Sequence, residues 1–401
     1  MTIRLAIVTT HPIQYQVPWF RALAAEPAVE LTVFYCQLPD AAQQGDGFGV
    51  AFAWDVPLLE GYRYEVLPNV AKSANVTTFR GCDNPAVYEK IQRGRFDAVI
   101  VNGWVAKSCL QALFASRRAG IPCIVRGESN AIRPRAWWKR QIHRSLLRQY
   151  AAFLVIGSSN AEFYRGHGIS PRRMFPGLYC VDNARFTSAA DRLRGRRNEL
   201  RAAWGISEDA TVVMYCGKFI PKKHPLTLLR SASLACNTGT RLHLLLAGDG
   251  ELRSECESFA RARQVPATFV GFLNQSRLAE AYVAADCLTL PSDDGETWGL
   301  VVNEAMACGR AAIVSDRVGC APDLIIPGRT GEVFPFGDEP ALAELLSRMG
   351  ADRHRLVEMG QAARSHVANY SIDALTSGTL AALDFACAPS RRAARRTARN
   401  D

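Results

Sequence analysis

Two carboxylates, Glu296 and Glu304, occur with seven residues between them in a segment that changes from loop-forming to helix-forming residues. Glu296 falls in a polar, glycine-containing loop, where its oxygens could accept hydrogen bonds from sugar hydroxyls. Glu304 falls within the following helix and could accept hydrogen bonds from both hydroxyls of a ribose. The alternative is two solvated glutamates on either side of a helix start.

The start of this helix favours the binding of an anion. Trp298, Gly299 and Leu300 stand at its first turn, and the helix is expected to stop at Gly309. The first N–H groups of a helix have no partner within it and carry partial positive charge, so they attract anions. We therefore expect an anionic group above the strand that ends at Leu290.

Short apolar strands alternate with amphipathic helices along both halves of the chain, which is typical of parallel sheets covered by helices. The predicted strands are, in order, 4–9, 29–35, 98–101, 121–125, 153–157, 211–216, 241–247, 267–270, 287–290, 311–315 and 332–334. The predicted helices are 17–25, 108–119, 225–236, 252–263, 276–285, 300–307 and 340–349. Ligands of such sheets bind outside the carboxyl ends of the strands, so we expect the site in a cleft between two domains.

The composition is that of a globular protein large enough for two cores. Of 401 residues, 48% are hydrophobic and 21% charged, and no apolar run approaches the roughly 20 residues that span a bilayer. The first apolar run is too short for a signal peptide. Twelve cysteines without a CxxC pair indicate small buried thiols in a reducing cytoplasm. We expect a protein that neither spans a membrane nor is exported.

The net charge of +10 attracts nucleic acid, anionic lipid and phosphate-bearing substrates alike. Five arginines and one aspartate lie between Arg391 and Asp401, in a tail that we predict to be disordered. An anchor to anionic lipid headgroups is the alternative for this tail.

Four segments in the second half resemble, in order, the donor-binding motifs of the family-4 retaining glycosyltransferases. The spacing of Glu296 and Glu304 is similar to the hallmark of that family. The other three segments are Gly217–His224, which resembles its Gly-Arg-x-x-x-x-Lys element, Leu244–Gly250 and Phe269–Leu273. Together they extend over about residues 211–334.

The resemblance implies roles for individual residues. Lys218 and Lys223 would clamp the diphosphate of a nucleotide donor, although Lys218 replaces an arginine and lacks its two-pronged fork. Gly217, Gly248 and Leu273 would line the donor site together with Trp298, Gly299, Leu300 and Glu304. Glu296 would position the sugar, so Glu296, Lys218, Lys223 and His11 are the candidate catalytic residues. The resemblance implies no metal and no cofactor besides the donor substrate.

The first half resembles the family more weakly. His11 follows the first strand, where many members carry glycines that are absent here, and it could contact the donor sugar or the acceptor, or be structural. Members often carry a histidine at the end of the fourth strand, but the corresponding stretch, 101–104, has none. Gln14, Asn102 and Arg126 are candidates to replace it.

A basic stretch with two tryptophans follows. Residues 126–148 hold seven lysines or arginines and one acid, with Trp137 and Trp138 adjacent. Such a helix suits the surface of an anionic membrane, which would bring the acceptor or the membrane to Arg126, Trp137 and Trp138. The alternative is a solvated basic helix with its tryptophans packed inward. No recognised nucleic-acid motif accompanies the patch.

These observations predict an α/β protein of the GT-B fold, with two Rossmann-like domains facing a cleft. The resemblance implies that a last helix crosses back to the first domain. The predicted parts are an acceptor domain at 1–183, a donor domain at 184–369, the crossover helix at 370–387 and the basic tail at 388–401. The last helix is expected near 372–386.

The predicted function is transfer of a sugar, with retention at the anomeric carbon, from a UDP- or GDP-sugar to a glycan or lipid-linked acceptor in cell-surface polysaccharide or glycolipid synthesis. We expect a cytoplasmic enzyme, peripheral on the inner face of the plasma membrane, that binds no nucleic acid. The alternatives are a basic nucleic-acid or phosphate-binding protein without catalysis, and a nucleotide-sugar hydrolase or epimerase of the same fold.

Overall fold

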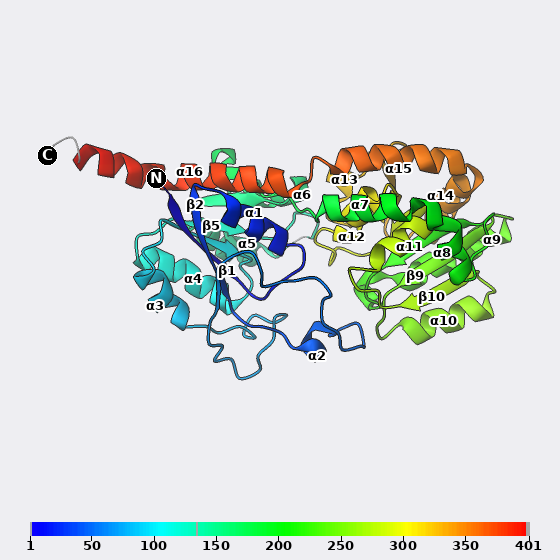
Figure 1. Ribbon diagram of the computed structural model, residues 1–401, viewed down its shortest axis with the longest axis horizontal. Coiled ribbons are helices and arrows are strands. Elements are labelled where there is room, and N and C mark those ends of the chain that lie inside the picture. Colours follow the sequence, from blue (N-terminus) through cyan, green and yellow to red (C-terminus); the bar gives the residue numbers. More distant parts are fainter. Residues whose placement is uncertain (1, 134, 398–401) are drawn as a thin grey trace. The chain divides into compact units, whose positions relative to one another are not determined.

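The computed structural model describes residues 2–133 and 135–397, which form two compact units (Figure 1). Unit 1 contains the described parts of Met1–Asp40, Pro57–Tyr179 and Ile372–Asp401. Unit 2 contains Ala41–Val56 and Cys180–Ser371. Residues 41–56, which the sequence suggested as part of the first domain, thus pack with the second half of the chain.

Unit 1 is built on a seven-stranded parallel sheet in the order β3-β2-β1-β4-β5-β6-β7. Its strands are β1 (Ile3–Thr9), β2 (Val29–Tyr35), β3 (Tyr64–Val66), β4 (Ala98–Asn102), β5 (Cys123–Arg126), β6 (Ala152–Val155) and β7 (Met174–Pro176). Its helices are α1 (Val17–Ala25), α3 (Ala86–Arg93), α4 (Lys107–Arg118), α5 (Trp137–Leu147), α6 (Ser158–Gly166) and α16 (Ile372–Thr397), with a short 3-10 turn at Pro171–Arg173.

The last helix, α16, packs on unit 1, as predicted (Figure 1). The indole of Trp19 in α1 donates a hydrogen bond to Thr379 in α16 over 3.2 Å. The helix extends to Thr397, so residues 388–397 of the predicted disordered tail are helical. Alanine and arginine dominate this part of the sequence, and both are strong helix formers. Residues 398–401 of the tail lie outside the described residues.

Unit 2 has a six-stranded parallel sheet in the order β10-β9-β8-β11-β12-β13. Its strands are β8 (Thr211–Cys216), β9 (Leu242–Ala247), β10 (Ala267–Gly271), β11 (Cys287–Leu290), β12 (Ala311–Ser315) and β13 (Gly331–Phe334). The strand order reverses between β8 and β11. In open parallel sheets such a reversal leaves a crevice at the carboxyl ends of the two strands, where ligands bind.

Helices cover both faces of this sheet. They are α7 (Asn183–Leu193), α8 (Arg197–Ala203), α9 (Pro225–Asn237), α10 (Arg253–Ala262), α11 (Leu278–Ala284), α12 (Leu300–Ala307), α13 (Ala321–Leu324), α14 (Glu339–Ala351) and α15 (Arg353–Val367), with 3-10 turns at Arg194–Arg196 and Pro221–Lys223. The short helix α2 (Ala41–Gln44) also belongs to unit 2.

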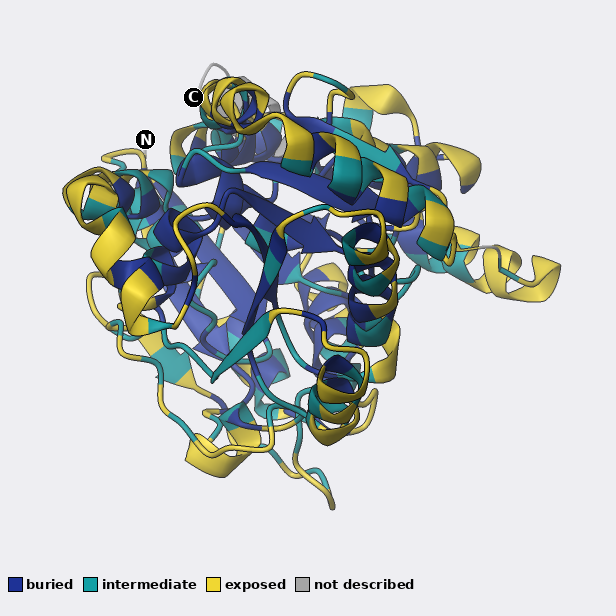
Figure 2. Ribbon diagram, turned by 90° about the vertical axis from the view of Figure 1, so that its right-hand side faces the viewer, coloured by how far each residue is buried: buried dark blue, intermediate teal, exposed yellow. Residues whose placement is uncertain are grey.

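The central strands of both sheets, such as β1, β4, β8, β11 and β12, are buried on both faces, which explains why their sequences are runs of apolar residues and do not alternate. Figure 2 shows most strands as buried and the outward faces of the helices as exposed. All twelve cysteines are free, and eleven of them are buried, as the sequence predicts. No helix among the described residues is long and apolar enough to cross a membrane.

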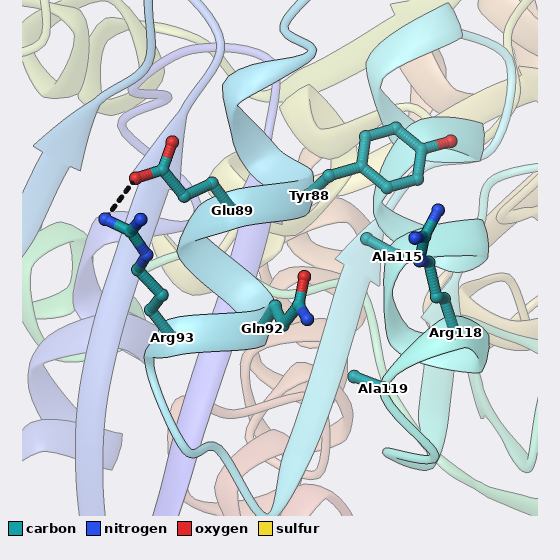
Figure 3. Close-up of a pocket in the computed structure, with 7 residues that line it drawn as sticks. All are labelled: Tyr88, Glu89, Gln92, Arg93, Ala115, Arg118 and Ala119. Atoms are coloured by element: carbon teal, nitrogen blue, oxygen red, sulfur yellow. Dashed lines mark ion pairs between the residues drawn. The ribbon is translucent and has the colours of Figure 1, made fainter.

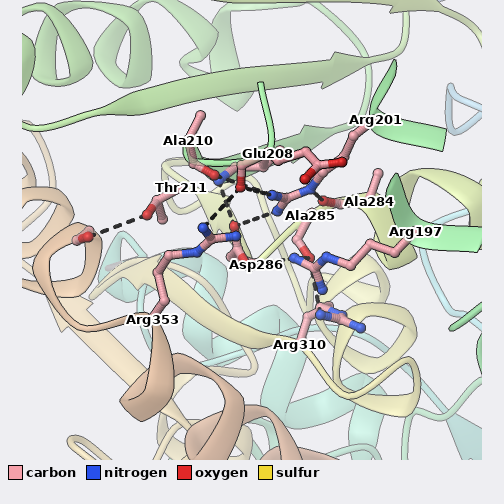
Figure 4. A network of polar contacts seen from close by, with 12 residues as sticks. Arg197, Arg201, Glu208, Ala210, Thr211, Ala284, Ala285, Asp286, Arg310 and Arg353 are labelled. Atoms are coloured by element: carbon pink, nitrogen blue, oxygen red, sulfur yellow. Dashed lines mark hydrogen bonds and ion pairs between the residues drawn. The ribbon is translucent and has the colours of Figure 1, made fainter. Parts of the chain in front are cut away.

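A buried ion-pair network fastens β11 to the helices around it (Figure 4). Both carboxylate oxygens of Asp286, directly before β11, are used: Arg201 lies 2.7 Å from one and Arg197 2.5 Å from the other. The amide of Val212 also donates to Asp286 over 2.7 Å. Only 1% of the Arg201 side chain and 7% of the Asp286 side chain is exposed. Water therefore solvates neither charge, and each is stabilised by the other.

Candidate functional site

Two loops of unit 2 meet where the strand order reverses. The loop after β8 carries Gly217, Lys218 and Lys223, and the loop after β11 carries Glu296. The backbone N–H of Asp293 in the second loop donates to the carbonyl of Lys222 in the first over 3.0 Å. The sheet topology thus brings together two segments that lie about 70 residues apart in the sequence.

Lys223 and Glu296 form an ion pair between these loops. The ammonium of Lys223 donates to Oε2 of Glu296, and the two side chains are only 15% and 14% exposed. A lysine has three N–H donors, so this contact leaves two for a ligand. The pair places a positive and a negative group side by side beyond the carboxyl ends of β8 and β11, which suits a ligand with both phosphate and hydroxyl groups.

Lys218 stands on the same loop and is half-buried. Its ammonium donates to the backbone carbonyl of Asp46 and lies 4.9 Å from the centre of the Phe48 ring. Burial lowers the pKa of Lys218. The charge of Asp46 opposes this shift, and the charges of Lys222 and Lys223 add to it. The carbonyl of Lys218 accepts a hydrogen bond from the hydroxyl of Tyr215 in β8 over 2.7 Å, which fixes the loop on the strand.

Helix α12 begins at Leu300, as predicted, and Gly299 caps its start. Gly299 has a φ of 103°, and a Cβ there would lie 2.8 Å from the side chain of Leu290, so only glycine fits. Trp298 is buried, and its indole donates to Asn303 over 2.8 Å. Any contact from Trp298 to a donor would therefore come from its backbone, while the indole ties the loop to α12.

Glu304 lies on α12 and is fully buried. Its Oε2 accepts a hydrogen bond from the hydroxyl of Tyr282 in α11 over 2.7 Å. The two glutamates of the sequence pattern therefore differ in their surroundings: Glu296 is paired with a lysine in the loop after β11, and Glu304 accepts a hydrogen bond from a tyrosine inside unit 2. Sequence reasoning missed Tyr282, which no motif marks.

The loops after β9 and β10 contribute the remaining predicted donor-site residues of unit 2, Gly248 and Leu273. Gly248 follows β9, and a Cβ there would lie 1.9 Å from the carbonyl oxygen of Gly217, so glycine lets these two loops touch. The N–H of Gly248 donates to the carbonyl of Gly271 over 2.8 Å. Leu273 follows in the loop after β10 and is partly exposed. Unit 2 thus brings its predicted donor-site residues to adjacent loops on one edge of the sheet.

His11 belongs to unit 1, in the loop after β1. Burial lowers the pKa of its imidazole from the ordinary value of 6.5 to about 4, so the imidazole is neutral near pH 7. Its Nδ1 lies 2.9 Å from the hydroxyl oxygen of Thr10. A neutral imidazole can donate or accept a hydrogen bond with a sugar but adds no charge to hold a phosphate.

Arg126, a candidate for the acceptor or the membrane, is a buried residue of unit 1. It ends β5, is 4% exposed, and donates to the carbonyls of Gly177 and Leu178 over 3.0 and 3.3 Å. Its guanidinium also lies 4.5 Å from the centre of the Tyr179 ring. Because its guanidinium is buried and donates to backbone carbonyls of unit 1, Arg126 is not part of a surface patch.

Helix α5 is exposed over most of its circumference, and its exposed side chains include basic and aromatic ones. Trp137 is 77% exposed and Trp138 50%, so the alternative in which the tryptophans pack inward is wrong. We define the docking face as the exposed residues on and beside α5: Arg133, Trp137, Trp138, Lys139, Arg140, Ile142, Arg144 and Arg148.

A pocket of about 520 Å³ lies elsewhere in unit 1, between α3 and α4 (Figure 3). Its charged side chains include Glu89 and Arg93, which pair with each other across one turn of α3 and are mostly exposed. Such a pair offers little to a ligand. Among the described residues, no group of three or more histidine, cysteine, aspartate or glutamate side chains is arranged to hold a metal ion.

Comparisons with known proteins agree with this geometry. The family described as glycosyl transferases group 1 matches residues 196–366, and the family described as glycosyl transferase 4-like domain matches residues 12–176. Among solved structures, that of Anabaena HepE in complex with UDP and glucose aligns with a TM-score of 0.69 and 14% identity, over 95% of this chain and 99% of that one. The structural similarity defines the GT-B class of fold.

Two curated relatives are similar in sequence. D-inositol 3-phosphate glycosyltransferase 2 of Catenulispora acidiphila is 31% identical over 55% of this chain and 52% of that protein. The GDP-mannose-dependent alpha-mannosyltransferase of Mycobacterium tuberculosis is 30% identical over 61% of this chain and 62% of that protein. The chain thus spans about half the length of the first of these relatives. With both halves matched, the chain belongs to the group 1 glycosyltransferases.

Proposed function

We propose that this protein transfers a sugar from a nucleoside diphosphate sugar to a glycan or lipid-linked acceptor in the synthesis of cell-surface polysaccharide or glycolipid. The observation that carries the proposal is the meeting of Lys218, Lys223 and Glu296 on two loops beside the start of α12. UDP and GDP are both candidates, because the HepE structure holds UDP and the mycobacterial relative is named for GDP-mannose.

The residues support transfer with retention. Glu296 is held by Lys223, so we propose that it positions hydroxyls of the donor sugar and does not attack the anomeric carbon. The bond from the anomeric carbon to phosphate breaks, and the acceptor oxygen bonds to the same face. The departing phosphate oxygen takes the acceptor's proton. Lys218, Lys223 and the first N–H groups of α12 would stabilise the growing negative charge without a metal.

Replacing Lys223 by alanine tests the phosphate site. We expect affinity for UDP or GDP, whichever the wild type binds, to fall about 10- to 100-fold, because a charge-assisted hydrogen bond is worth about 1.5–3 kcal/mol. Isothermal titration calorimetry measures this change. The matched control is Lys222→Ala, which removes the same charge from an exposed neighbour. Equal affinities in wild type and Lys223→Ala, or equal losses in both variants, would contradict the assignment.

We further propose that the docking face rests on anionic lipid headgroups, which would bring unit 1 to a lipid-linked acceptor. Its tryptophans are exposed beside five exposed lysines and arginines. Aromatic rings favour the headgroup region, and each basic side chain near an anionic surface is worth about 1 kcal/mol. Such attraction is reversible, because it is screened over a Debye length of about 8 Å at physiological salt.

Sedimentation with phosphatidylserine vesicles tests this docking. We expect the protein to bind at low salt and to be released as salt rises, and a chain ending at Pro389 to bind equally well. Trp137→Ala combined with Trp138→Ala should weaken binding at every salt concentration. Arg117→Ala combined with Arg118→Ala on α4 is the control, since both are exposed arginines of the same unit. If the shortened chain no longer bound, the C-terminal arginines and not the docking face would hold the membrane.

A further inference from the structure

Residues 41–56, here called the strap, pack on unit 2 although they lie between β2 and β3 in the sequence. Asn274, in the loop after β10, donates from its side chain to the carbonyl of Ala53 over 2.7 Å. The N–H of Ser276 donates to the carboxylate of Asp55 over 3.1 Å. These bonds fix the end of the strap beside the carboxyl edge of the sheet.

Aromatic side chains of the strap gather around Phe272, the residue that follows β10. The Phe52 ring stacks on it with centroids 4.1 Å apart, Phe48 meets it edge-on at 5.0 Å, and Trp54 lies at 6.3 Å. Aromatic pairs of this kind add about 0.5–1.5 kcal/mol beyond the area that they bury. The cluster therefore holds the middle of the strap in place.

The glycines of the sequence Gly45-Asp46-Gly47-Phe48-Gly49 allow the strap to reach the loops after β8 and β9. Gly47 has a φ of 75°, and a Cβ there would lie 3.1 Å from the ammonium nitrogen of Lys218. Its carbonyl oxygen would lie 3.0 Å from a Cβ placed on Gly250. Glycine at both positions permits this close approach of two backbones.

The strap makes two contacts with Lys218. The carbonyl of Asp46 accepts a hydrogen bond from the ammonium, and the Phe48 ring lies 4.9 Å from it. A lysine side chain is flexible, and ordering it costs up to about 2 kcal/mol of conformational entropy. Where an arginine would offer a planar fork, a lysine needs its position fixed by other groups. Two N–H donors of the ammonium remain after the bond to Asp46.

We propose that the strap positions Lys218 to receive the donor diphosphate, and that Phe48 is the positioning residue. This inference rests on the proposed function, since it assigns Lys218 to phosphate. Phe48 acts through Lys218 and touches no reacting atom. The alternative is a strap that occupies the nucleotide site and must leave before the donor binds. In that case Phe48→Ala would bind the nucleotide more tightly than wild type.

The test is a double-mutant cycle in the full chain, with UDP or GDP, whichever the wild type binds more tightly, as the probe. Phe48→Ala is expected to weaken binding about 3- to 10-fold, the range of a partly desolvated cation–π contact. The same substitution in a Lys218→Ala background should change nothing. Affinity for the matching nucleoside, which lacks phosphate, should stay the same. Phe48→Tyr should restore wild-type binding, and Val50→Ala, at an exposed strap position, is the control.

Four results would overturn the inference. Tighter binding by Phe48→Ala would show a strap that blocks the site. An equal loss in the Lys218→Ala background, or a loss of nucleoside affinity, would show that Phe48 acts on the base or on folding. An unchanged affinity in Phe48→Ala, while Lys223→Ala still weakens binding, removes the strap's role and leaves the proposed function standing. If neither lysine variant weakened binding, the proposed function itself would fail.

Discussion

Glu296→Gln is expected to slow sugar transfer about 100-fold while leaving affinity for the nucleoside diphosphate within about threefold of wild type. The expected 100-fold slowing is the usual cost of misplacing a reacting group by about 1 Å. Nucleotide affinity should survive because the substitution removes the partner of Lys223, whose ammonium then remains available to phosphate. Single-turnover transfer from UDP- and GDP-sugars, together with calorimetry, measures both quantities.

Asp294→Asn is the matched control for that variant. It removes one negative charge from the same loop, two residues away, and should leave transfer nearly unchanged. Comparable slowing in Asp294→Asn would attribute the effect to the charge of the loop. A 100-fold loss of nucleotide affinity in Glu296→Gln would place Glu296 on the nucleotide and not on the sugar.

Glu304→Gln should show the reverse pattern, with weaker binding of the whole nucleotide, if Glu304 accepts hydrogen bonds from the ribose. Because Glu304 is buried and bonded to Tyr282, a structural role must be separated from a binding role. The 2′-deoxy form of the nucleotide separates them: it should bind more weakly than the parent to wild type but equally to Glu304→Gln. Tyr282→Phe, which removes the hydroxyl and not the carboxylate, should keep the preference for the ribose form.

The sequence predicts most of the parallel sheet of unit 2 because buried strands are continuous apolar runs bounded by turn residues. Helix α12 is a clear case: Gly299 marks its start and the predicted bounds 300–307 match those observed. Short edge strands are harder to predict. β3 and β7 have only three residues each, too few for a periodic pattern, and they depend on pairing with β2 and β6. Pairing of this kind is a tertiary effect that local propensity does not encode.

The candidate site was predictable where residues lie on one loop and not where distant segments meet. The sequence marks Lys223 and Glu296 separately, but their ion pair depends on the adjacency of β8 and β11. The strap was missed for the same reason, since no local pattern shows that Phe48 packs on Phe272. Arg126 was grouped with the basic helix because it is close in sequence, yet its place at the end of β5 buries it.

Asp286→Ala is expected to destabilise unit 2 by about 3–5 kcal/mol, the usual cost of removing one partner of a buried ion pair. The substitution leaves the guanidinium of Arg201 buried without a carboxylate, and it removes the acceptor of the Val212 amide. Replacement of the whole network by apolar residues would cost much less, because the penalty comes from the uncompensated charge and not from the lost attraction.

Hydrogen exchange of the amides in β8 and β11 measures this effect within unit 2, because these central strands exchange mainly when the unit opens globally. Protection should fall by a factor of about 10² to 10⁴, with a lower urea midpoint for the same amides. Asp209→Ala is the control: it breaks the pair with Arg241, whose side chains are 78% and 58% exposed, and should cost no more than about 1 kcal/mol. If both variants lost a similar free energy of unfolding, burial of the Arg201–Asp286 pair would not increase its contribution to stability. Sheet pairing and apolar packing alone would then hold β11 in place.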